Sequence, residues 1–96
     1  MAAFFAGAFL ANAVPHFAYG ICGDPFPTPF GKPPGKGLSS PTVNVLWGLF
    51  NLLVGCVLFR FGHVCRGGLP AQLVFFAGIT VLSVLMSRQF ANKLPR

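Results

Sequence analysis

Long apolar runs alternate with short polar segments along this chain. The runs cover residues 2–22, about 41–61 and about 70–88, and a loop at 23–40 separates the first two. A helix that rises about 1.5 Å per residue needs roughly 20 residues to cross about 30 Å of hydrocarbon. The pattern therefore predicts an all-α integral membrane protein. Residues 1–96 would form a single membrane domain, a bundle of three transmembrane helices with a short basic tail.

The loop between the first two helices has an unusual composition. Five prolines between residues 23 and 37 forbid a helix or a central strand there. Phe26 and Phe30 alternate with these prolines, although a free linker would avoid large apolar groups. We therefore expect an ordered, extended Pro/Gly/Phe-rich loop whose two phenylalanines enter the membrane interface or pack on helix ends. Ser40 and Pro41 fit the N-cap and first position of the second helix.

Composition strengthens the membrane assignment. Apolar residues make up 54% of the chain and charged residues only 8%, whereas a soluble domain has about 25% charged residues. So few charges cannot cover the surface of a soluble fold, and the twelve phenylalanines would add further exposed apolar area. These features argue strongly against a soluble enzyme, and we expect an integral membrane protein.

The residue types that carry catalysis and metal binding are scarce. Asp24 is the only acidic residue, so no pair of carboxylates exists for general acid–base chemistry. Cys22, Cys56 and Cys65 lack the spacing of metal ligands, and their number and positions argue against a disulfide framework. We therefore expect no catalytic residues, no metal site and no cofactor.

Basic residues lie at the ends of the apolar runs. They do not gather with exposed aromatic residues on one face, which argues against nucleic-acid binding. The loop and tail share one side of the membrane and carry Lys32, Lys36, Arg88, Lys93 and Arg96, whereas Arg60 and Arg66 lie on the other side. Positive charge marks the cytoplasmic side, so we expect the amino end outside and the carboxyl end inside. Lys32 and Lys36 either contact lipid phosphates or are solvated lysines that set this orientation.

Polar side chains inside the apolar runs are the best clue to contacts, because polar groups in a bilayer need partners. Depths measured by helical rise place such residues in the cytoplasmic half, and we predict one polar layer formed by Asn12, His16, Asn44, Asn51, Thr80 and Ser83. Asn12 should lie level with Asn51 and Thr80. Three interpretations of this layer are open. It holds the helices together by hydrogen bonds, it forms a site for a ligand, proton or ion, or it contacts the polar groups of a partner subunit.

Two further features of the second run concern packing. Gly48 and Gly55 lie on the same helix face as Asn44 and Asn51, and this stripe of small and amide side chains predicts close helix packing. Trp47 lies beside the stripe, so we expect its indole N–H to have a hydrogen-bond partner.

His16 allows several interpretations. A hydrogen bond to Asn12 or Asn51 is the simplest, and a single-histidine pigment or haem site is the alternative. A bis-histidine haem within one chain is excluded, because His63 lies at the far end of the second helix, more than roughly 20 Å away by the helical rise.

Four segments in the first half of the chain carry a resemblance. They are residues 12–17 (NAVPHF), 25–30 (PFPTPF), 37–41 (GLSSP) and 44–51 (NVLWGLFN). These segments resemble a family of short bacterial inner-membrane proteins with no known activity. The resemblance implies a location in the bacterial inner membrane and implies nothing about mechanism.

We therefore expect a small non-catalytic membrane protein that contacts lipid and other membrane subunits, as an accessory or structural subunit of a larger complex, or that self-associates. The alternative is a homo-oligomeric channel or carrier for a small solute, with a polar layer at Asn12, His16 and Asn51. The two hypotheses differ in whether that layer is closed within one chain or faces an oligomer axis.

Overall fold

Three long helices form most of the protein. The computed structural model describes residues 1–34 and 37–91. Its elements are α1 (Ala2–Ile21), β1 (Phe26–Pro27), β2 (Leu38–Ser39), α2 (Pro41–Phe61) and α3 (Gly68–Phe90). Each helix is long and apolar enough to cross a membrane, so the three predicted spans are confirmed by length and composition. The third helix is slightly longer at both ends than the apolar run suggested.

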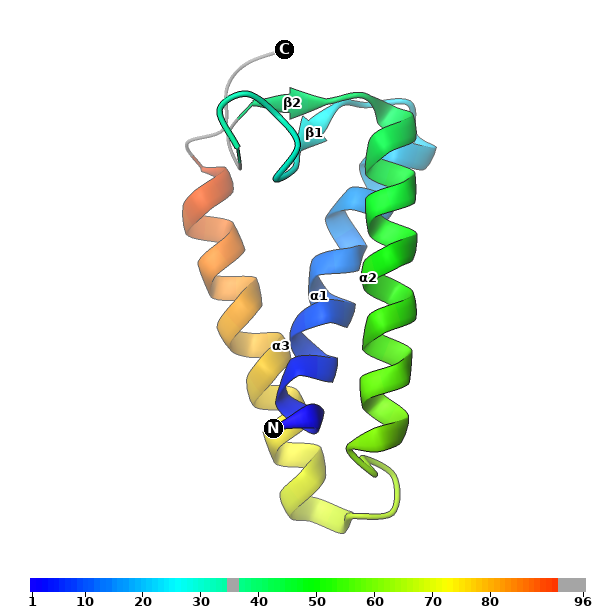
Figure 1. Cartoon of the computed structure of the whole chain (residues 1–96). Coiled ribbons are helices and arrows are strands. Elements are labelled where there is room, and N and C mark those ends of the chain that lie inside the picture. Colours follow the sequence, from blue (N-terminus) through cyan, green and yellow to red (C-terminus); the bar gives the residue numbers. More distant parts are fainter. Residues whose placement is uncertain (35–36, 92–96) are drawn as a thin grey trace.

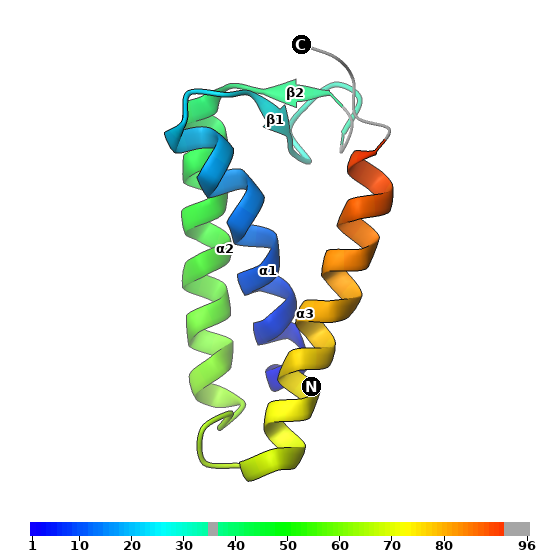
Figure 2. The ribbon, with the colours of Figure 1, turned by 180° about the vertical axis from the view of Figure 1, so that it is seen from behind.

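α1 lies between the other two helices. It packs along α2 and also contacts α3, whereas α2 and α3 share few contacts. Figures 1 and 2 show that α3 approaches α1 near the α2–α3 turn and diverges from it toward the opposite end. The loop between α1 and α2 and the C-terminal end of α3 both lie at that opposite end, which we call the loop end (Figure 1).

Glycines set the crossing of α1 and α3. A Cβ atom at Gly78 would overlap the carbonyl oxygen of Phe4, and one at Gly7 would overlap the carbonyl oxygen of Phe75. Backbone therefore packs directly on backbone here, which is typical of small residues between membrane helices. Gly78 is the one buried residue of α3, so α3 is held mainly at this crossing.

The loop is extended and pairs with itself at the loop end. β1 and β2 are antiparallel, with Phe26 opposite Ser39 and Pro27 opposite Leu38. Ser40 then starts α2, because its side-chain oxygen accepts a hydrogen bond from the Val43 N–H at 3.2 Å. Pro41 occupies the first turn, where a missing N–H costs nothing. The predicted helix start is therefore confirmed.

Candidate functional site

Asn44 joins the loop to the helices. Its side chain is fully buried. The amide nitrogen Nδ2 lies 3.0 Å from the carbonyl oxygen of Phe26, 3.2 Å from that of Ser39 and 3.1 Å from that of Ser40. One side chain in the first turns of α2 thus holds both strands of the loop.

His16 of α1 completes this network. Its Nδ1 lies 2.9 Å from Oδ1 of Asn44. The Asn44 nitrogen already donates to carbonyls, so Oδ1 is an acceptor and the Nδ1–H of His16 donates. In the neutral imidazole, Nε2 is then an acceptor, and within the described residues no hydrogen bond reaches it.

The partner of His16 therefore differs from the expected one. The sequence favoured Asn12 or Asn51, but these two residues bond to each other, with Nδ2 of Asn12 donating to Oδ1 of Asn51 at 2.9 Å. His16 is one helical turn nearer the loop end than Asn12, which brings it level with Asn44 instead. Asn51 also donates from Nδ2 to the Trp47 carbonyl oxygen at 2.7 Å.

The structure does not bring Thr80 and Ser83 into this layer. Thr80 is exposed, and its hydroxyl donates to the Phe76 carbonyl oxygen of its own helix at 2.9 Å. Ser83 is also exposed. The face of α3 that meets α1 is the one with Gly78, and Thr80 points nearly opposite to it on a helix with 3.6 residues per turn. The polar layer is therefore made by α1, α2 and the loop.

Aromatic rings enclose the loop side of His16. Phe26 stacks on Tyr19 with ring centroids 4.4 Å apart. It also meets the Phe90 ring edge-on at 4.7 Å and the His16 ring at 5.4 Å. Phe26 therefore packs on helix ends as expected. Phe30 is exposed and meets the Trp47 ring edge-on at 5.2 Å.

One residue of this region escaped the sequence analysis. Thr28 is buried, its hydroxyl pairs with that of Ser39, and it accepts a hydrogen bond from the Phe30 N–H at 3.1 Å. The available signal in the sequence was the position of Thr28 between two prolines. Prolines supply no N–H groups, so a hydroxyl at this position is a natural hydrogen-bonding group for the segment.

Gly48 and Gly55 lie where α2 meets α1, as their stripe predicted. A Cβ at Gly48 would lie 2.8 Å from the backbone nitrogen of Phe17. A Cβ at Gly55 would lie 2.6 Å from Cδ2 of Leu10, the end of a flexible side chain. Both glycines therefore permit close packing, but the neighbour of Gly48 is the less able to move.

Alanine at these two glycines should have unequal effects. We expect Gly48→Ala to lower the free energy of unfolding by about 2 kcal/mol, because overpacking against backbone is not relieved by a rotamer change. Gly55→Ala should cost about 1 kcal/mol or less, since Leu10 can turn aside. Unfolding in detergent micelles, followed by Trp47 fluorescence, would measure both. Equal losses would contradict this account.

A cavity of about 240 Å³ lies beside the polar layer. Asn12 and His16 of α1, Trp47 of α2, the loop segment 27–29 and the last turns of α3 line it. Contrary to expectation, Nε1 of Trp47 is buried and has no hydrogen-bond partner within the described residues. The site thus combines a hydrogen-bonded polar network with an unmatched, buried donor.

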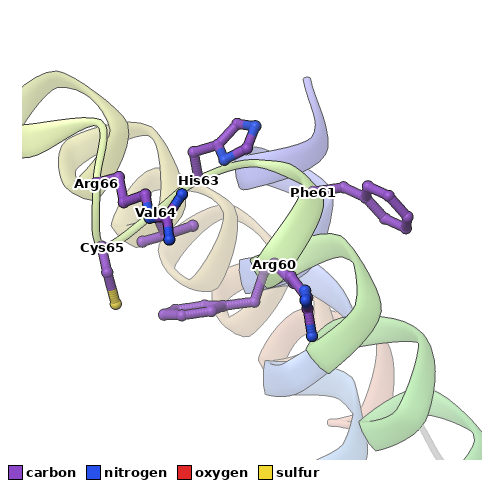
Figure 3. Close-up of a pocket in the computed structure, with 7 residues that line it drawn as sticks. Arg60, Phe61, His63, Val64, Cys65 and Arg66 are labelled. Carbon is purple, nitrogen blue, oxygen red and sulfur yellow. The ribbon is translucent and has the colours of Figure 1, made fainter.

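Basic side chains surround a second hollow at the α2–α3 turn. Its volume is about 500 Å³, and Arg60, His63 and Arg66 are among its lining residues. All three are exposed. In Figure 3 the His63 ring and the Arg60 side chain point in opposite directions, so they do not converge on one anion. Lys32 is exposed in the loop, and Lys36 lies outside the described residues.

Possible metal ligands are scattered over the described residues. Across residues 1–34 and 37–91, no cluster of three or more His, Cys, Asp or Glu side chains could hold a metal ion. Cys22, Cys56 and Cys65 are free and exposed. Functional inference rests on this geometry alone, since no family model, no curated protein and no solved structure matches the chain.

Proposed function

We propose that the protein spans a membrane three times and works without catalysis, as an accessory subunit of a larger membrane assembly or by self-association. The bacterial inner membrane, with the carboxyl end in the cytoplasm, is the location we propose. Three helices that are long and apolar enough to cross a membrane support the span assignment.

The observation that carries the proposal is the mutual hydrogen bonding of the polar layer within one chain. Asn44 is 0% exposed, Asn51 1% and His16 2%. Their side chains bond to one another, to Asn12 and to the loop. A channel or carrier lined by Asn12, His16 and Asn51 needs these groups to face a solute path. Their mutual bonding supports an interaction protein over that alternative.

The exposure of α3 supports the same proposal. α3 buries the smallest share of its span among the three helices. Thr80, Ser83 and Ser87 all lie on its exposed surface, and spacings of three and four residues place them on one face. Small and hydroxyl residues are enriched where membrane helices meet, so this face suits another membrane helix.

The distribution of charge supports the proposed orientation. Lys32 and the end of α3 with Arg88 lie at the loop end, whereas Arg60 and Arg66 lie at the α2–α3 turn (Figures 1 and 3). Lys93 and Arg96, which also count toward the cytoplasmic side, lie outside the described residues. By sequence, the loop and the tail contain five basic residues and the α2–α3 turn region two, which favours placing the loop side in the cytoplasm.

Native mass spectrometry of the protein, extracted mildly from its own membranes, tests the proposal. We expect a hetero-complex or a homo-oligomer, and a monomer alone would overturn the proposal. Ser83→Phe should reduce the associated fraction at least tenfold, because the ring blocks the hydroxyl face of α3. Val81→Phe, at another exposed site on α3 outside that stripe, is the matched control and should leave association unchanged.

A further inference from the structure

The cavity beside the polar layer has two walls of different chemistry. One wall contains Asn12, His16 and Trp47, and the other, from α3, contains Leu82, Leu85 and Met86 together with Gln89. Its lining includes the loop segment 27–29 and the last turns of α3, and the ribbon of α3 diverges from α1 toward this end (Figures 1 and 2). A molecule with a polar head and an apolar body fits two such walls.

The polar wall contains one unmatched acceptor. The Asn44 bond leaves Nε2 of neutral His16 as an acceptor without a partner within the described residues. Trp47 also lines the cavity, but its Nε1–H is fully buried, so a group inside the cavity does not reach it. A hydroxyl group donates a hydrogen bond, so a bound hydroxyl complements His16.

Charge and volume narrow the ligand class. The residues that line the cavity include no Asp, Glu, Lys or Arg, which disfavours an ionic head group because a buried charge needs a partner. A cavity of about 150 Å³ holds benzene, so about 240 Å³ holds one substituted ring. Met86 and Phe90 also line the cavity. Aromatic rings and thioethers pack favourably on an aromatic ligand.

We propose that this cavity binds a neutral, lipid-soluble molecule with a single-ring phenol or hydroquinone head. The hydroxyl donates to Nε2 of His16, while the ring packs on the α3 wall beside Trp47. This inference goes beyond the proposed function, which assigns no ligand. It shares with that function only the assumption that the chain lies in a membrane.

The single tryptophan of the chain provides the test. The indole ¹⁵N–¹H resonance of the full-length protein in detergent micelles is titrated with 4-propylphenol, 4-propylanisole and propylbenzene. We expect a saturable shift with the phenol and at least tenfold weaker binding of the anisole, which has no hydroxyl proton. Equal, non-saturating shifts for all three compounds would show partition into the micelle only and would overturn the proposal.

A cavity-filling variant provides an independent check. Leu82→Phe adds a ring to the apolar wall without touching the hydrogen bonds, and it should weaken 4-propylphenol binding at least tenfold. Val81→Phe, its neighbour on the exposed surface, should bind as the parent does. Unchanged binding in Leu82→Phe would overturn the proposal. Association measured by native mass spectrometry is a separate readout, so either proposal can fail while the other stands.

Discussion

Replacing Asn44 with alanine should destabilise the protein more than any other polar substitution in the described structure. The change removes the donor to the Phe26, Ser39 and Ser40 carbonyls and the acceptor of His16. A buried polar group left without a partner costs about 1–3 kcal/mol. We expect the free energy of unfolding in detergent micelles to fall by about 3 kcal/mol, and the loop to become sensitive to protease.

Two controls separate this effect from a general loss of polar contacts. Asn51→Ala removes bonds to Asn12 and to the Trp47 carbonyl but none to the loop, so the loop should stay protected from protease. Thr80→Ala removes one exposed bond within α3 and should change the unfolding free energy by less than about 0.5 kcal/mol. A loss below about 1 kcal/mol for Asn44→Ala would mean that other contacts hold the loop.

Leucine at Gly78 should separate α3 from α1. The first added atom would already overlap the Phe4 carbonyl oxygen, and backbone cannot turn aside as a side chain can. Leucine has a higher helix propensity than glycine by nearly 1 kcal/mol, so helix propensity alone would stabilise the variant. We nevertheless expect the unfolding free energy to fall by about 3 kcal/mol, because overpacking costs about 1–3 kcal/mol and occasionally more, and α3 also loses its packing on α1.

The matched control for this variant is Ala77→Leu. Ala77 is the preceding residue of α3 and is exposed, so the same side chain there projects away from α1. Its stability should stay within about 0.5 kcal/mol of the parent. If both leucine variants unfold at the same denaturant concentration, the glycine crossing is not what holds α3.

The sequence predicted the helices because apolar runs of this length have one dominant solution in a membrane. It also predicted the start of α2, since Ser40 and Pro41 act locally and need no knowledge of distant contacts. The meeting of Asn12 with Asn51 followed from depth alone. In each of these cases a one-dimensional quantity, such as run length, cap identity or helical rise, was sufficient.

The sequence could not predict contacts that depend on helix rotation and loop height. α3 has a glycine face and a hydroxyl face, and either is suited to helix packing. Only the close approach at Gly78 decides between them, and it turns Thr80 outward. Likewise, Asn44 binds His16 because the folded loop brings the Phe26 carbonyl within its reach, and no periodicity encodes the path of a proline-rich loop.

The central position of α1 has a consequence for biogenesis. α1 has the lowest mean hydropathy of the three spans and the largest buried share. Its polar residues Asn12 and His16 find their hydrogen-bond partners on α2. A ribosome makes α1 before those partners exist, and a helix with unpaired polar groups partitions poorly into lipid. We therefore expect the translocon to retain α1 until α2 arrives and to release the two as a helical hairpin, with α3 docking last.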